Sequence, residues 1–103
     1  MIITSSKNSV PIRLSQERWG HVTRRHPEMG SEKDKVLETI SDPDAVLSGD
    51  FGELLAVRLY PTTPLTRKHL VVAYREISDR DGFVVTAYFT NAPSKRRTTI
   101  WKR

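Results

Sequence analysis

A few side chains in the sequence could together break an RNA chain without a metal ion. RNA is cleaved when its 2′-OH is deprotonated, the charge of the phosphorane is balanced and the leaving 5′-oxygen is protonated. His21 could exchange a proton, arginines could bind the phosphate through paired N–H groups, and the hydroxyls of Thr86 and Tyr88 could orient it. This chemistry requires a fold that brings these groups together.

Thr86 and Tyr88 belong to an alternating segment, residues 83–90, which predicts a central β-strand. The alternation places four residues on a face suited to a core, namely Phe83, Val85, Ala87 and Phe89. The opposite face carries Val84, Thr86, Tyr88 and Thr90. Three hydroxyls in a row on a rigid strand can line a polar cleft, although threonine and tyrosine are also good strand formers on a solvated face.

His21 lies in a predicted helix that runs from about Gln16 to His26. Ser15 is a favourable N-cap, and Pro27 ends the helix because the residue before a proline avoids helical geometry.

Helical spacing sorts the side chains of this helix into two neighbouring stripes. The first stripe contains Arg18, His21 and Arg25, and the second contains Trp19, Val22 and His26. We expect the second stripe to face the core, with His26 packed or capping the helix. His21 is then exposed or faces a cleft.

The rest of the chain predicts one more helix and further strands. Ser31 with Asp34 resembles a capping arrangement for a helix from Lys35 to Ser41, whose apolar stripe is Val36, Leu37 and Ile40. Alternation then predicts strands at 45–48, 53–60 and 68–77, with a turn at 49–52, a loop at 61–64 and a hairpin connection at 78–82. Residues 9–13 read as a short extended lead-in that Pro11 limits to a sheet edge.

This order of elements predicts a single α+β domain over residues 1–103. Two N-terminal helices should pack on a roughly four-stranded antiparallel meander, followed by a basic C-terminal tail from residue 95. The first ten residues lack the pattern of a signal peptide, and no apolar run approaches the length of a membrane span. We therefore expect a cytoplasmic protein with no membrane partner.

Metal and cofactor chemistry is not indicated by the sequence. There is no cysteine, and His21 and His26 are five residues apart, which turns them away from each other on a helix. No glycine-rich phosphate loop is present. We therefore expect neither a metal ion nor a cofactor.

The net charge of +5 is unevenly distributed along the chain. Residues 28–53 hold eight acids against two lysines, whereas the segments before and after them are strongly basic. A basic surface of this kind favours polyanions such as RNA. Arg24 and Arg25 should join the tail in one positive region, and the candidate RNA-binding residues are Arg24, Lys95, Arg96, Arg97 and Lys102.

Three short motifs, in this order, resemble small toxin-type nucleases. They are Trp19-x-His21-x-x-x-Arg25-His26-Pro27, Val71-Val72-Ala73-Tyr74-Arg75 and Phe83-Val84-Val85-Thr86-Ala87-Tyr88. The chain from about residue 15 to 101 is in this way similar to the barnase–EndoU–colicin–RelE-like superfamily, in particular its phage and bacterial branch. The resemblance implies metal-independent cleavage of RNA, such as tRNA or mRNA, and an acidic antitoxin or immunity protein as partner.

The resemblance also implies which residues line the cleft. By matching position these are His21 with Arg25, then Arg58 or Arg75 as the strand arginine, then Thr86 and Tyr88. Whether Arg75 faces the cleft depends on strand register, because a hairpin that pairs Ile77 with Phe83 places Tyr74 beside Thr86, and a one-residue bulge reverses this.

Two other functions fit the same sequence. A non-catalytic nucleic-acid-binding module could use the basic tail, with Trp101 stacking on a base, although Trp101 could equally close the edge of the sheet. An interaction protein could use the basic face to bind an acidic partner. The combination of His21, Thr86 and Tyr88 favours the ribonuclease.

Overall fold

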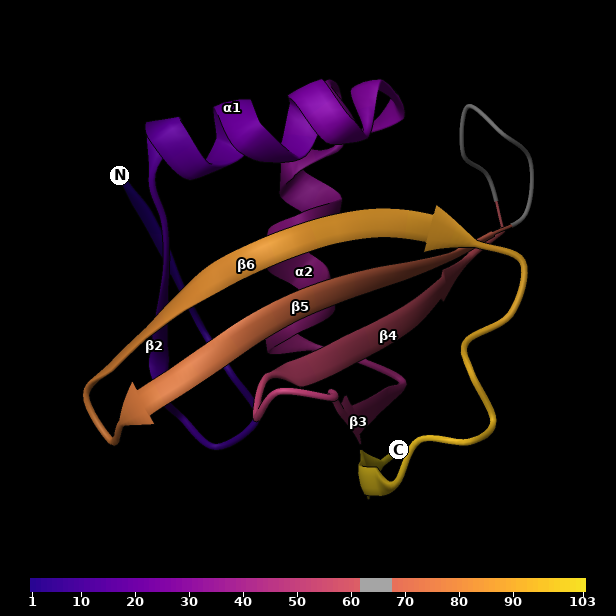
Figure 1. Ribbon diagram of the computed structural model, residues 1–103. Coiled ribbons are helices and arrows are strands. Elements are labelled where there is room, and N and C mark those ends of the chain that lie inside the picture. The colour runs from indigo at the N-terminus through magenta and orange to yellow at the C-terminus, as the bar shows by residue number, and fades with distance from the viewer. Residues whose placement is uncertain (62–67) are drawn as a thin grey trace.

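The computed structural model describes residues 1–61 and 68–103 of the chain. Within these residues it contains seven strands, two α-helices and a short 3₁₀ helix, η1 (Figure 1). In chain order they are β1 (Ile2–Ser5), β2 (Pro11–Leu14), α1 (Gln16–Arg25), η1 (Pro27–Met29), α2 (Lys33–Ser41), β3 (Ala45–Ser48), β4 (Leu54–Tyr60), β5 (Lys68–Ser78), β6 (Asp81–Thr90) and β7 (Thr99–Lys102).

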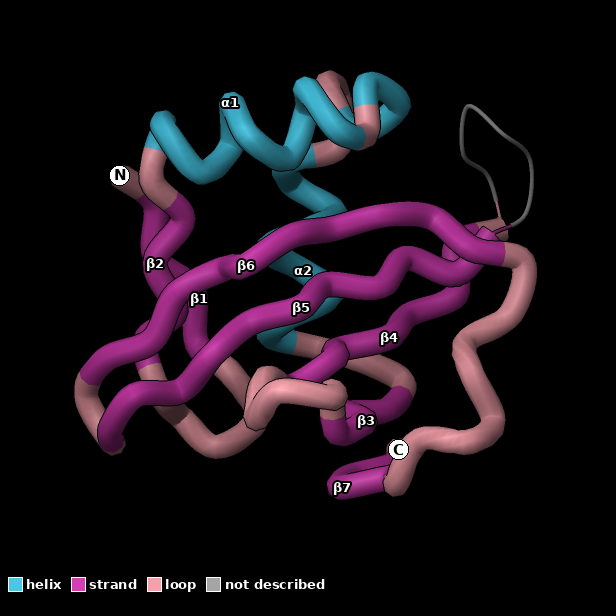
Figure 2. Tube along the Cα trace, in the orientation of Figure 1, coloured by secondary structure: helices cyan, strands magenta, loops and turns pink. Residues whose placement is uncertain are grey.

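All seven strands form one mixed sheet in the order β1-β2-β6-β5-β4-β3-β7 (Figure 2). Neighbouring strands are antiparallel except β2 and β6, which run parallel through Ile12 opposite Gly82 and Arg13 opposite Phe83. The predicted fold of two N-terminal helices on a four-stranded antiparallel sheet is therefore wrong. Two strands precede the helices, and the sheet is both larger and mixed.

Among the described residues, β1 and β7 were not predicted, and β2 corresponds to the extended lead-in predicted at residues 9–13, although it lies between β1 and β6 and not at the predicted sheet edge. β1 and β2 form a hairpin, and β2 then joins β6, which lies about 70 residues further along the chain. The basic tail contains β7, whose Trp101 pairs with Val46 of β3. β1 and β7 were missed because the four residues of each, Ile2–Ser5 and Thr99–Lys102, carry too little alternation to indicate a strand on their own.

The predicted meander of long strands is present. β4, β5 and β6 are consecutive antiparallel neighbours, and α2 packs on β4 and β5. We call the side of the sheet that carries α2 the helix face and the other side the open face. The main core lies on the helix face, where Val36 and Ile40 of α2 pack with Ala56, Leu70 and Val72. The loop predicted at 61–64 falls, apart from Pro61, outside the described residues.

α2 begins without the predicted capping pair. The helix starts at Lys33 after Glu32, which makes no side-chain capping bond, and the Ser31 hydroxyl instead lies 3.4 Å from a Glu32 carboxylate oxygen. Beside α2, the hydroxyl of the buried Tyr60 donates to the carboxylate of the exposed Glu38 at 2.7 Å. Burial raises the pKa of this tyrosine, and the bond to Glu38 adds to the shift.

β6 contains a bulge that changes which side chains reach each face. Ala73 of β5 lies opposite Thr86, but the next residue, Tyr74, lies opposite Val84, so that Val85 has no partner of its own. Val84 consequently turns into the core with 1% exposure, and Val85 joins the apolar cluster of the open face. The predicted alternation of Val84 with Thr86 and of Val85 with Ala87 is therefore wrong at this point, because an inserted residue reverses the phase of a strand.

The ends of the sheet approach each other around α2, which contacts β1 as well as β4 and β5. Lys7, in the turn after β1, places its ammonium 4.6 Å from the ring centre of Trp101 in β7. Trp101 is half-buried at this edge. Neither α1 nor α2 has the length and apolar character needed to cross a membrane, and no other helix of the described residues does.

Candidate active site

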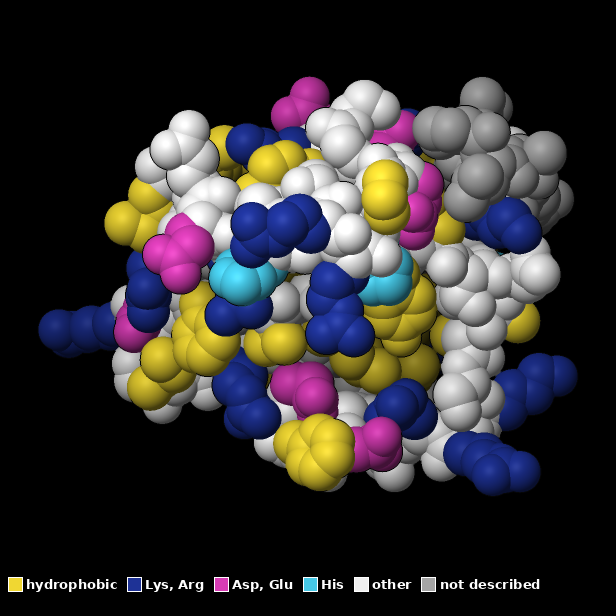
Figure 3. Space-filling model, turned by 45° about the horizontal axis from the view of Figure 1, so that its top comes forward, with side chains coloured by type: hydrophobic (Ala, Val, Ile, Leu, Met, Phe, Trp, Pro, Cys, Tyr) yellow, Lys and Arg dark blue, Asp and Glu magenta, His cyan; other side chains and the backbone are white. Residues whose placement is uncertain are grey.

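A cleft of about 540 Å³ lies between α1 and the open-face side chains of β6. Both elements contribute to it, and its lining residues are Arg18, His21, Val22, Arg25, His26, Val85, Thr86 and Tyr88. Figure 3 shows histidine, lysine and arginine side chains exposed together on one face of the molecule. The cleft therefore brings together His21, Arg25, Thr86 and Tyr88, four of the six residues predicted for the chemistry.

The local sequence explains why α1 lies beside β6. β2 pairs with β6 only as far as Phe83, and the chain then turns at Ser15, whose hydroxyl accepts the Arg18 N–H at 3.1 Å and starts α1. The helix then packs along β6 and buries Val22 (Figure 1). The predicted start of this helix at Gln16 is confirmed, and Trp19 and Val22 of the predicted core stripe do pack in the core. The helix ends at Arg25, one residue earlier than predicted, with His26 as its C-cap. This arrangement turns the Arg18, His21 and Arg25 stripe toward the cleft.

His21 is an exposed side chain at the rim of the cleft. Its Nδ1 lies 3.2 Å from a terminal guanidinium nitrogen of Arg24. A guanidinium can only donate hydrogen bonds, so His21 Nδ1 is the acceptor in this contact.

His26 is the cleft residue that the sequence reasoning assigned to packing or capping alone. Its backbone N–H does cap α1 by donating to the Val22 carbonyl at 2.8 Å. Its ring also lines the cleft, where it packs on Tyr88 with a centroid distance of 5.8 Å, and Nδ1 lies 3.6 Å from a Glu28 carboxylate oxygen. The signal that could have found it is Pro27, because a histidine forced to end a helix leaves the helical stripe and can turn toward a neighbouring strand.

The cleft is electropositive. Arg25 is exposed and makes no ion pair with the described residues, and the Arg18 guanidinium lies 3.5 Å from the Val85 carbonyl of β6. No carboxylate of the described residues lines the cleft. Two arginines and two histidines around one hollow are groups that can donate hydrogen bonds to a phosphate.

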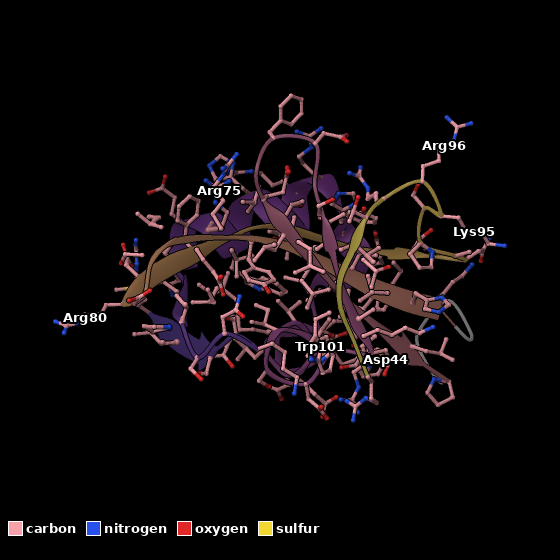
Figure 4. The ribbon with its side chains drawn as sticks, turned by 90° about the horizontal axis from the view of Figure 1, so that it is seen from below. Asp44, Arg75, Arg80, Lys95, Arg96 and Trp101 are labelled. Carbon is pink, nitrogen blue, oxygen red and sulfur yellow. The ribbon has the colours of Figure 1, made fainter. Side chains whose placement is uncertain are left out.

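Arg58 and Arg75, which were predicted for the same cleft, lie elsewhere. Arg58 is on the helix face and donates to the Asp42 carboxylate at 2.8 Å, beside Glu38 and the ring of Tyr60. Arg75 projects from the open face and donates to the Phe51 carbonyl at 2.6 Å in the β3–β4 turn (Figure 4). The bulge in β6 places Arg75 opposite Phe83, away from Thr86.

The five candidate RNA-binding residues do not form one continuous patch. Arg24 lies on α1 beside His21 but does not line the cleft, whereas Lys95 and Arg96 project outward from the segment after β6 (Figure 4). Arg97 is paired with both carboxylate oxygens of Asp50, at 3.0 and 3.2 Å, and this hydrogen bonding raises the pKa of its guanidinium. Lys102 is exposed on β7 at the edge of the sheet.

No cluster of three or more histidine, aspartate or glutamate side chains in residues 1–61 and 68–103 is arranged to hold a metal ion. Comparison with known proteins found no matching family model, no matching curated protein and no matching solved structure. The residues of the cleft are therefore the features that indicate a function.

Proposed function

We propose that the protein is a ribonuclease that cleaves RNA by attack of a 2′-OH on the adjacent phosphodiester. The observation that supports this most strongly is the presence of His21, His26 and Arg25 in one cleft with Thr86 and Tyr88. Two imidazoles, a guanidinium and two hydroxyls are the groups that this reaction needs. A protein that only bound RNA would not need two groups in one cleft that can exchange protons near neutral pH.

In the proposed reaction one imidazole removes the proton of the 2′-OH and the other protonates the departing 5′-oxygen. The new bond joins the 2′-oxygen to phosphorus, the bond from phosphorus to the 5′-oxygen breaks, and the products carry a 2′,3′-cyclic phosphate and a 5′-OH. His21, beside Arg24, and His26, between Glu28 and Tyr88, are the two candidates; the one that acts as base starts as a neutral imidazole with a free ring nitrogen, and the one that acts as acid starts as an imidazolium. Their two roles exchange in the reverse direction.

The phosphate would be held by the other cleft residues. Arg25 is available to bind two phosphate oxygens and to balance the negative charge that grows on the phosphorane. Thr86 and Tyr88 stand two residues apart on the open face of β6 and can each donate a hydroxyl proton. Because these groups supply both proton transfer and charge balance, the proposed cleavage does not require a divalent cation.

The proposed biological setting follows from the charge. A basic protein of +5 that cuts RNA such as tRNA or mRNA would need restraint inside the cytoplasm that produces it. An acidic antitoxin or immunity protein that covers the cleft would provide that restraint. The protein would then be the toxin of such a pair.

The direct test uses purified protein and RNA in the presence of EDTA. The wild type should cut RNA and leave 2′,3′-cyclic phosphate ends, and His21→Ala should lower the rate by on the order of 10²–10⁴-fold. His69→Ala is the matched control, because His69 is on β5 outside the cleft, with Nδ1 3.2 Å from the Asn91 carbonyl.

Two results would contradict the proposal. One is a folded His21→Ala variant that cuts at the wild-type rate. The other is a wild type that binds RNA and never cuts it, which would favour the non-catalytic binding module.

A further inference from the structure

A second hollow, of about 280 Å³, lies on the open face of the sheet beside the cleft. Its floor is apolar and consists of Leu47, Leu55, Val57 and Val71, from β3, β4 and β5. The chain that follows β6 forms its outer wall. Tyr88 lines both this hollow and the cleft, so a single side chain separates them.

The rim of the hollow is polar, and its groups have defined hydrogen-bonding roles. The Thr90 hydroxyl donates to the Ala92 carbonyl at 3.1 Å, which leaves its oxygen free to accept. The Ser94 hydroxyl oxygen accepts the Arg96 N–H at 3.3 Å, which leaves its proton free to donate. Arg97 is held in place by Asp50. The rim can therefore bind both donors and acceptors on the edge of a ligand.

The size and shape of the hollow limit which chemical groups it can bind. At about 280 Å³ it lies near the lower end of the range for small-molecule sites, roughly 300–1,000 Å³. A flat ring system with apolar faces and a polar edge matches an apolar floor bounded by a polar rim. Among the parts of an RNA chain, this description fits a nucleobase and excludes the charged backbone.

We propose that this hollow is a nucleobase subsite for the RNA that enters the cleft. The base of a nucleotide next to the phosphate leaves its stack and inserts beside Tyr88, over Leu55 and Val71. Proteins commonly recognise unpaired RNA in this way, by stacking splayed bases on aromatic and arginine side chains. The inference rests on the proposed function, and it adds that the enzyme requires a base beside the bond that it cuts.

The subsite is tested with short RNAs in which one nucleotide beside the cleaved bond is abasic but keeps its 2′-OH. For the wild type, loss of the inserted base should lower kcat/KM by about tenfold or more at one of the two flanking positions. Ala92→Trp should remove this difference, because Ala92 is an exposed residue on the wall of the hollow and an indole there closes the entrance. Asn91→Trp, next to it in sequence but outside the lining, is the matched control.

A second measurement keeps the subsite testable even without cleavage. Free guanosine, adenosine, uridine and cytidine contain no phosphate, and at least one of them should shift the NMR signals of the Leu55 and Val71 methyl groups. If the wild type cuts no RNA, the proposed function fails, and these shifts alone decide the subsite.

The subsite is overturned by either of two results. The first is equal cleavage of intact and abasic RNA at both flanking positions. The second is the absence of methyl shifts with all four nucleosides.

Discussion

The imidazole of His26 lies against the ring of Tyr88, with centroids 5.8 Å apart and planes inclined by 34°. The contact joins the end of α1 to β6 across the floor of the cleft. In the proposed reaction Tyr88 therefore has two separable roles, because its ring can position His26 while its hydroxyl donates to the phosphate.

Variants of Tyr88 should separate these roles. Tyr88→Phe keeps the ring and loses one hydrogen bond to the phosphate, so RNA cleavage should fall by about tenfold. Tyr88→Ala should cost more, approaching the loss of on the order of 10²–10⁴-fold expected for His26→Ala. Single-turnover cleavage rates measure both, and equal rates for Tyr88→Phe and Tyr88→Ala would show that the ring does not position His26.

Arg25 and Arg58 should behave differently although both were candidates for the same site. Arg25→Ala removes a guanidinium from the cleft and should lower cleavage by on the order of 10²-fold, with little change in thermal stability. Arg58→Ala breaks the contacts to Asp42 and should cost about 1 kcal/mol of unfolding free energy, with cleavage per folded molecule unchanged. Denaturant unfolding and cleavage assays on the same samples compare the two, and loss of activity in folded Arg58→Ala would contradict the placement of Arg58.

Replacing Gly82 should destabilise the fold, because this residue lies where β2 pairs with β6. A Cβ at this position would lie 2.4 Å from the Arg75 carbonyl oxygen and 2.6 Å from Ile12 Cδ1. Gly82→Ala should therefore lower the free energy of unfolding by about 1–3 kcal/mol. Gly20→Ala is the control, because no atom lies within 4 Å of a Cβ there and alanine should stabilise α1 by roughly 0.5–1 kcal/mol. Chemical denaturation that ranks the two variants in the opposite order would contradict the β2–β6 pairing.

RNA binding should weaken steeply as salt is added. Lysine and arginine side chains that bind RNA release counterions from its phosphates, and added salt opposes that release. Lys95→Ala should make the slope of log K against log salt shallower by about 0.7, the value for one contact to a single strand. Arg80→Ala is the control, since Arg80 projects from the opposite end of the molecule (Figure 4). Fluorescence anisotropy over a salt series measures the slopes, and a flat series for the wild type would favour an acidic protein as the partner of this surface.

Acid should weaken the ion pair that holds β2 to β6. The hydrogen bond from Arg13 lowers the pKa of Asp81 from its ordinary 3.8. The Asp81 carboxylate therefore binds a proton less readily in the folded protein than in the unfolded chain. The ion pair therefore contributes its full stability above the ordinary pKa of Asp81. It loses this contribution as the pH falls through the lowered pKa that Asp81 has in the folded protein. Asp81→Asn should lose less thermal stability than the wild type between about pH 5 and pH 2. Asp79→Asn, which removes no ion pair among the described residues, should follow the wild type.

The parts of the fold that were predictable are those specified by neighbouring residues. Ser15 and Pro27 mark the ends of α1, and the long alternating segments identify β4, β5 and β6. The pairing of β2 with β6 could not be predicted, because nothing near Ile12 in the sequence indicates Gly82 as its partner.

Part of the candidate site could also be predicted from neighbouring residues. The rest could not, because it depends on how distant segments pack. His21 and Arg25 follow from helical spacing, and Thr86 and Tyr88 from their two-residue separation on one strand. Arg58 was misplaced because β4 is buried on both faces, with Ala56 at 0% exposure and Val57 at 3%, so alternation does not reveal which face carries the helices. The bulge at Val85 has no local sequence signal.

The two walls of the cleft come from opposite ends of the chain, residues 18–26 and residues 85–88. A protein is synthesised from its N-terminus to its C-terminus. The segment with both histidines, α1 and its C-cap, therefore leaves the ribosome long before the strand that completes the cleft. A fragment that ends before β6 contains only the α1 wall of the cleft. Cutting the chain between α2 and β3 would place the two walls in separate fragments. Complementation of two such pieces would make the assembled cleft detectable in a living cell.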